Sequence, residues 1–228
     1  KLGLNIAKKR KQKFIEDIIL GNLAILYFNR SDYKTSLEVF NEQLKVAVEI
    51  GDKFGEALAY GNIATIFFQL SDLNKTIEFL LKKKNIIEEM GNKRSLNIVL
   101  GNLGQYYLSL NDFQKAKECF EKKLKDSKEM EDKYNVGISY GYLGNFYFKK
   151  KEFKTSEKCL KKAISICREL KVQDFLGEYL YRLAELKYYQ NEYKTALKHS
   201  NSSLKIAEEI NQPKLINANK ELKEKILR

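Results

Sequence analysis

The stretch that decides the fold is "GNLAILYFNRSDY" (Gly21–Tyr33), which recurs as "GNIATIFFQLSDL" (Gly61–Leu73) and "GNLGQYYLSLNDF" (Gly101–Phe113). The three copies start 40 residues apart, and weaker copies follow at Gly141 and Tyr181 without any insertion or deletion. A fixed period of this length is typical of a solenoid, in which each unit packs only on its neighbours. The sequence therefore predicts an array of five similar units.

Each unit contains the pattern of two helices. In the first helix, apolar residues recur at i, i+3, i+4 and i+7, which places them on one face. The helix is expected to break at "SDY", "SDL", "NDF", "KEF" or "NEY", where polar and acidic residues suit the start of a second helix. Pro213, the single proline, fits the first turn of a last helix. In the first unit, the apolar face of the first helix consists of Leu20, Leu23, Ala24 and Tyr27, which we call the apolar stripe.

These patterns predict an all-α solenoid of antiparallel helix pairs that forms a single domain over residues 1–228. Residues 1–12 are expected to be the second helix of a truncated repeat, and residues 213–228 a capping helix. The five helix-pair repeats are expected at 13–52, 53–92, 93–132, 133–172 and 173–212.

Composition agrees with a helical protein. The 228 residues are 43% hydrophobic and 32% charged, with one proline, which favours helices over strands. No apolar run reaches the roughly 18–20 residues of a membrane span, and the start "KLGLNIAKKRK" lacks the apolar core of a signal peptide. We expect a cytoplasmic chain, and its first residue, Lys1, indicates a piece of a longer protein.

No pattern of catalytic residues occurs. Phosphate-binding loops, metalloprotease motifs and nucleophile–histidine sets are missing. Cys119, Cys159 and Cys167 lack metal-ligand spacing, and the single histidine, His199, falls at the position of two of them, so packing or surface exposure is the expected role. We expect no enzyme activity, no cofactor and no metal site.

The net charge of +12 leaves two interpretations open. A basic chain can bind nucleic acid or another anionic partner. The lysines are however spread along the chain, and the lysine clusters at 8–13, 82–84 and 149–151 have no aromatic platform paired with them in the sequence pattern. We expect solvated lysine-rich faces, with nucleic-acid binding as the weaker alternative.

The repeats are similar to those of the tetratricopeptide repeat family. The resemblance lies in Leu, then Gly or Ala, then Tyr at spacing 0, +1 and +4 in the first helix, and in a small residue early in the second, such as Ser36 or Ala116. The 40-residue length resembles the subtype in spindle-orientation regulators and bacterial signalling proteins. The resemblance implies a right-handed superhelix that acts as a non-enzymatic scaffold, in which first helices line a concave groove for peptides.

On a helical wheel, one face of the first helices lies opposite the apolar stripe, and we expect it to line that groove. Asn22, Asn62 and Asn102 recur there at the 40-residue period, and an amide can both donate to and accept from a peptide backbone. The glycine before each asparagine costs about 1 kcal/mol in a helix, so we expect it to permit close approach of neighbouring first helices. The predicted peptide-binding residues are Asn22, Ile25, Asn29, Asn62, Thr65, Gln69, Asn102, Gln105, Tyr142, Asn145, Lys149, Arg182 and Glu185.

Two functions from different classes fit this sequence. The first is a scaffold that binds a peptide or helical segment of a partner protein. The second is the peptide-sensing arm of a larger signalling or transcription-regulating protein. A carboxylate clamp is not expected, because only Lys149 and Arg182 supply positive charge on the predicted face.

Overall fold

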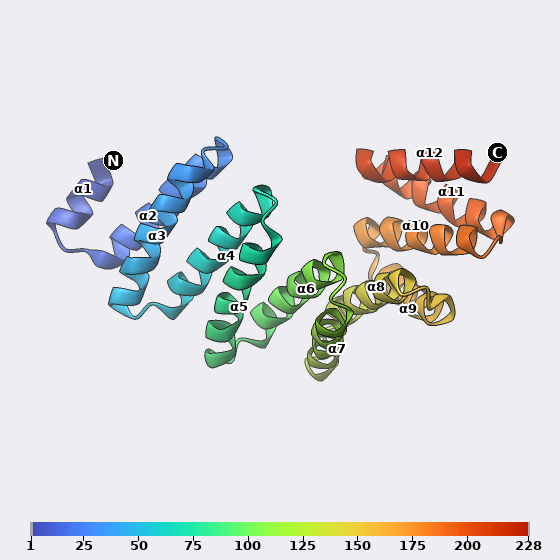
Figure 1. Cartoon of the computed structure of the whole chain (residues 1–228), viewed down its shortest axis with the longest axis horizontal. Coiled ribbons are helices and arrows are strands. Elements are labelled where there is room, and N and C mark those ends of the chain that lie inside the picture. Colours follow the sequence, from blue (N-terminus) through green and yellow to red (C-terminus); the bar gives the residue numbers. More distant parts are fainter. Residues whose placement is uncertain (1, 228) are drawn as a thin grey trace. The chain divides into compact units, whose positions relative to one another are not determined.

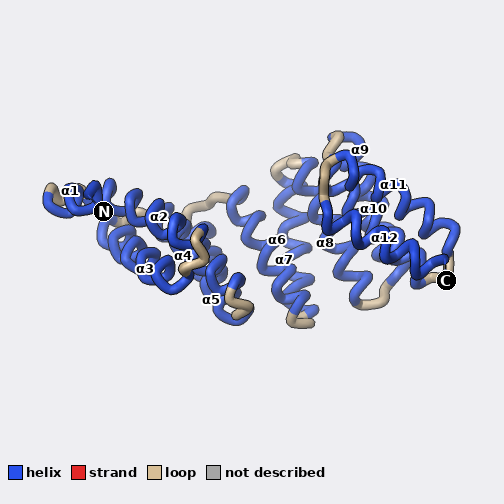
Figure 2. Tube along the Cα trace, turned by 90° about the horizontal axis from the view of Figure 1, so that it is seen from above, coloured by secondary structure: helices blue, strands red, loops and turns tan. Residues whose placement is uncertain are grey.

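The computed structural model describes residues 2–227, and every element in this range is an α-helix (Figures 1 and 2). Turns of a few residues join the helices. The helices are α1 (Leu2–Lys9), α2 (Lys13–Asn29), α3 (Tyr33–Ile50), α4 (Lys53–Gln69), α5 (Leu73–Glu89), α6 (Lys93–Ser109), α7 (Phe113–Glu129), α8 (Lys133–Lys149), α9 (Phe153–Leu170), α10 (Gln173–Tyr189), α11 (Tyr193–Glu209) and α12 (Pro213–Leu227).

The first helices of the repeats, α2, α4, α6, α8 and α10, begin 40 residues apart, at residues 13, 53, 93, 133 and 173. Four of them, α2, α4, α8 and α10, are each followed by a second helix that packs along them, as Figure 1 shows for α2 and α3 and for α8 and α9. The predicted all-α fold of helix pairs is therefore confirmed.

By its internal contacts the chain divides into two compact units, Lys1–Val99 and Leu100–Arg228, with the boundary inside α6. The organisation of residues 1–228 as one domain remains a prediction.

Acidic side chains start several second helices, as the sequence predicts, and Asp52 and Asp132 also start first helices. The Oδ1 of Asp32 accepts from the Thr35 amide at 3.1 Å, and the Oδ1 of Asp72 accepts from the Lys75 amide at 3.0 Å. These bonds satisfy amide groups that have no partner within the helix. Glu152 and Glu192 occupy the same position without such a bond, because of their longer side chains. Pro213 begins α12, as predicted.

The core of each unit lies between the first and second helices. In the N-terminal unit, Phe40 of α3 is 1% exposed and packs with Ala24, Ile63 and Ile66. In the C-terminal unit, Leu160 of α9 is fully buried among Leu180, Leu183 and further side chains of α9 and α10. Ala24 and Gly144 occupy the same repeat position, and their small size leaves room for the large side chains of Phe40 and Leu160, respectively.

Within residues 2–227, no helix is both long and apolar enough to span a bilayer.

Candidate functional site

Part of the predicted first-helix face forms a hollow between α2 and α4. The hollow, which we call the α2–α4 hollow, has a volume of about 270 Å³. Ile25 and Asn29 come from α2, and Asn62 and Thr65 come from α4, so four predicted residues that are up to 40 positions apart meet there. Phe28 and Phe40 complete the apolar lining. Asn22 and Gln69 are exposed on the same helices but do not line it.

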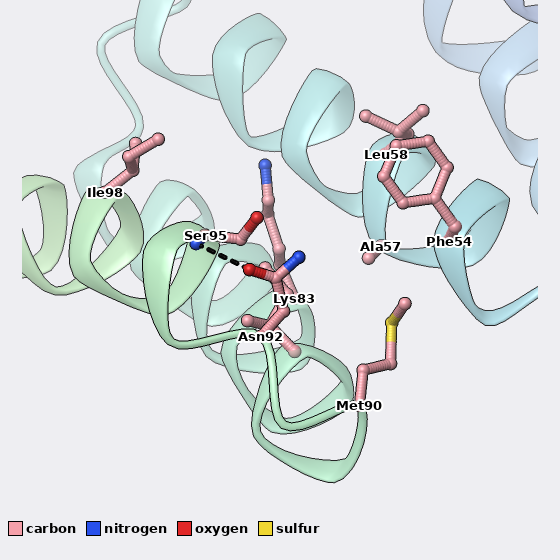
Figure 3. Close-up of a pocket in the computed structure, with 9 residues that line it drawn as sticks. Phe54, Ala57, Leu58, Lys83, Met90, Asn92, Ser95 and Ile98 are labelled. Atoms are coloured by element: carbon pink, nitrogen blue, oxygen red, sulfur yellow. Dashed lines mark hydrogen bonds between the residues drawn. The ribbon is translucent and has the colours of Figure 1, made fainter. Parts of the chain in front are cut away.

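A second, smaller pocket of about 90 Å³ lies between α4, α5 and the start of α6 (Figure 3). We call it the Lys83 pocket. Its polar side is formed by Asn92, whose Oδ1 accepts from the Ser95 amide at 3.0 Å, and by the Lys83 side chain. Its apolar lining comes from Phe54, Ala57, Leu58, Ile87, Met90 and Ile98.

Lys83 reaches this pocket from the second helix of its repeat. A Cβ atom on residue 61 would lie 2.7 Å from the Lys83 Nζ, so the glycine at this position leaves room for the ammonium group to pass α4. Burial lowers the pKa of Lys83, because a charged ammonium loses hydration there. Within residues 2–227, no acceptor is bound to the Lys83 ammonium. The pocket therefore combines an apolar wall with one uncompensated cation.

The recurring glycines make room for side chains, and this corrects the simple expectation of close helix approach. Gln43 and Lys83, from second helices, fill the space beside Gly21 and Gly61. At the two later positions an aromatic ring from the next first helix fills most of the space instead. These two contacts are Tyr142 beside Gly101 and Tyr179 beside Gly141.

In the C-terminal unit, the predicted residues do not gather in one hollow. Asn102 and Gln105 of α6 are exposed, and Asn145 of α8 is half-buried. The Tyr142 ring lies against Gly101 and 5.3 Å from the Phe120 ring, and burial raises the pKa of its hydroxyl. Tyr142 is thus mainly a packing residue, although its position on the wheel matches the asparagines.

Arg182 and Glu185 of α10 bind each other. The Arg182 Nη1 donates to the Glu185 Oε2 at 2.8 Å, and the Tyr181 hydroxyl donates to Glu185 at 3.1 Å. Both side chains are partly buried, with 36% of Arg182 and 20% of Glu185 exposed. Both charges are already compensated, which leaves them less available to a ligand than the lone Lys83.

Lys149 lines a third hollow, of about 200 Å³, with Lys151 and the rings of Phe148, Phe153 and Tyr189. Tyr189 is 61% exposed, and its ring lies 5.5 Å from Phe148 and 6.5 Å from Phe153. The expectation that no aromatic platform accompanies the lysine cluster at 149–151 was wrong. The platform is assembled from three helices, since Tyr189 comes from the following repeat.

Several residues of the Lys83 pocket were missed from the sequence. Leu58 and Ile98 occupy the same repeat position, and they are 42% and 61% exposed. The signal that could have identified them is an exposed apolar residue that recurs at the same position in consecutive repeats. Lys83 had no such signal, because it lies on a second helix and reaches the pocket only through the gap at Gly61.

Comparison with family models gives two matches, both described as tetratricopeptide repeat. One covers residues 135–209 and the other residues 99–125. A comparison with curated protein sequences finds no match.

Solved structures share the fold at low sequence identity. A signal transduction ATPase with a tetratricopeptide repeat sensor, from Pyrococcus horikoshii, is 18% identical with a TM-score of 0.82, over 94% of this chain and 33% of that protein. Aspartyl phosphate phosphatase F from Bacillus subtilis is 13% identical with a TM-score of 0.86, over 98% and 59%. A Rap protein complexed with Competence and Sporulation Factor is 13% identical with a TM-score of 0.74, over 95% and 60%.

The chain thus spans between one third and three fifths of these proteins. The 40-residue period, the antiparallel helix pairs, the matches to family models and the structural neighbours lead to the same conclusion. Residues 99–125 and 135–209 match the tetratricopeptide repeat family, and the chain as a whole is similar to that family in its fold.

Proposed function

We propose that this protein is a non-enzymatic scaffold that binds a peptide segment of a partner on the first-helix face of its N-terminal unit. The observation that carries the proposal is the α2–α4 hollow, in which Asn29, Asn62 and Thr65 stand beside apolar side chains. Amides and a hydroxyl can bond a peptide backbone, while Ile25 and Phe28 can contact its side chains.

The Lys83 pocket extends this surface along α4. Phe54 and Leu58 are exposed apolar residues, 58% and 42% respectively, and such side chains clustered around a pocket are typical of interaction sites. The Rap protein complexed with Competence and Sporulation Factor, which shares this fold, supports a binding role for such a surface.

The test uses peptides selected for binding to the intact chain from a random library, with affinity measured by fluorescence anisotropy. Asn62→Ala should weaken the selected peptides by about 2- to 13-fold, since one net hydrogen bond is worth about 0.5–1.5 kcal/mol. Asn85→Ala is the matched control, because Asn85 is an exposed amide on the second helix α5. Equal affinity for both variants would reject this face as the binding site.

The sensor arm of a larger protein is the second candidate. The Pyrococcus horikoshii neighbour carries a tetratricopeptide repeat sensor within a longer signalling ATPase, and this chain covers only 33% of it. The sequence that flanks Lys1 and Arg228 in the gene tests this candidate. A DNA-binding, kinase or nucleotide-hydrolysing domain there would favour the sensor over the scaffold.

A further inference from the structure

A fourth hollow, of about 270 Å³, lies in the C-terminal unit on the second-helix side of α10. We call it the His199 hollow. Its rim carries Lys161, Ser165 and Arg168 from α9 and His199 from α11. Its floor consists of the buried side chains Ile164, Leu180 and Leu183. It shares no residue with the predicted peptide-binding face.

Every titratable residue that lines the His199 hollow is basic. Arg168 is exposed and, within residues 2–227, has no carboxylate partner. Lys161 is bound at 2.8 Å by Glu157, which also binds Lys187 at 2.9 Å, so this carboxylate is shared between two cations. The rim therefore carries an excess of positive charge.

This combination is specific to one junction between repeats. The rim positions carry one Lys, one Ser, one Arg and one His here, whereas each of the preceding junctions has an acidic residue or fewer cations at these positions. The same positions are Glu121, Lys125, Lys128 and Cys159 one repeat earlier, and Asn41, Lys45, Val48 and Phe79 in the first junction. A general drift toward lysine does not explain an arginine and the single histidine at one hollow.

The pKa of His199 reflects the positive charges around the hollow. Its pKa is lowered, first by burial and then by four surrounding cations. These cations are Lys198 on its own helix, Lys187 on α10, and Arg168 and Lys161 on α9. An anion placed in the hollow would be attracted by the same groups.

We propose that the His199 hollow binds a low-molecular-weight phosphate monoester, with the phosphate at the basic rim and the organic group on the apolar floor. A phosphate monoester carries about −1.5 to −2 charges at pH 7 and three strong acceptor oxygens, which suits several cations and a serine hydroxyl better than one carboxylate does. The volume is slightly below the roughly 300–1,000 Å³ of pockets for drug-sized ligands, which favours a small compound. This site is independent of the proposed peptide-binding function.

The test follows the Hε1 proton of His199 by NMR, and the assignment is unambiguous because the chain has one histidine. Phenyl phosphate should shift this resonance in a saturable manner and raise the pKa of His199 by about 1–3 units, since a neighbouring anion stabilises the imidazolium. The absence of a saturable shift at millimolar phenyl phosphate would overturn the proposal.

Two variants and two further ligands complete the test. Arg168→Gln should weaken phenyl phosphate about tenfold or more, since a bond to a charged group is worth about 1.5–3 kcal/mol. Lys128→Gln removes a cation at the Arg168 position of the preceding repeat and should change the affinity less than about twofold. Equal binding to both variants would refute the assignment. Inorganic phosphate that binds as tightly as phenyl phosphate would refute the role of the floor, and tighter binding of a phosphoserine peptide would refute a small-molecule ligand.

Discussion

The Nζ of Lys83 occupies the space that a Cβ atom of residue 61 would need, at 2.7 Å from its ideal position, whereas the Tyr179 ring occupies that space at residue 141, at 2.2 Å. The same repeat position is thus a glycine for two different reasons. The tip of a lysine is flexible and can move, but a buried aromatic ring cannot.

Alanine substitutions at these two glycines should consequently have opposite effects. Gly61→Ala should be neutral or stabilise by up to about 1 kcal/mol, because alanine is the better helix former. Gly141→Ala should destabilise by about 1–3 kcal/mol, because Tyr179, which is 4% exposed, has no free space to move into. Urea unfolding measures both changes, and equal effects of the two substitutions would contradict this account of the contacts.

The buried Lys123 should make the stability of the fold depend on pH. It is 2% exposed, its Nζ donates to the Asn135 Oδ1 at 2.8 Å, and burial lowers its pKa from 10.5 to about 8, with Asp132 opposing the shift. Between pH 8 and pH 10.5 the unfolded chain binds more protons at this site than the folded chain does. The contribution of Lys123 to the free energy of unfolding should therefore rise with pH across this window, by up to about 3 kcal/mol.

The measurement for Lys123 compares the wild-type chain with Lys123→Met in urea at pH 7.5, 9 and 10.5. The difference between them isolates this group, and the rise with pH should be smaller in the variant, where only other groups such as Lys83 contribute. Lys125→Met is the control, since the Lys125 side chain is 76% exposed and should retain the wild-type slope. A slope in Lys123→Met equal to that of the wild-type chain would show that other groups cause it.

The asparagines of the first-helix face should contribute little to folding. Asn102 is exposed and Asn62 is half-buried. Asn102→Ala and Asn62→Ala should each change the free energy of unfolding by less than about 0.5 kcal/mol, because neither side chain belongs to the buried core. Leu103, the next residue in the sequence, is fully buried. Leu103→Ala should therefore lower the free energy of unfolding by about 2–5 kcal/mol. Chemical denaturation distinguishes them, and asparagine variants as unstable as Leu103→Ala would indicate a structural role.

Removal of Ile210–Arg228 should leave a folded but less stable chain. This truncation takes away α12, whose Leu215 and Leu222 are buried and whose Asn219 bonds Ser200 and Ser203. Because repeat units contact mainly their neighbours, the loss should remain local. Circular dichroism should show most of the helicity and a lower Tm, and a complete loss of helicity would argue against local packing.

The sequence alone determined the helices and their period. Leu20, Ala24 and Tyr27 identify one helical face, and Asp32 and Asp72 start the helices that follow, because spacing and capping act over a few residues. The sequence also identified Asn29, Asn62 and Thr65 as members of one face, since a 40-residue repeat places equivalent residues in equivalent positions.

Only the tertiary structure decided which side chains pass between helices. Lys83 enters a pocket through the gap at Gly61, and Tyr142, which has the same wheel position as the asparagines, packs against Gly101. Tyr189 likewise joins Phe148 of the preceding repeat to form an aromatic platform. The physical reason is that a helical wheel gives the direction of a side chain, whereas its length, its rotamer and the free volume beside the next helix decide what it contacts.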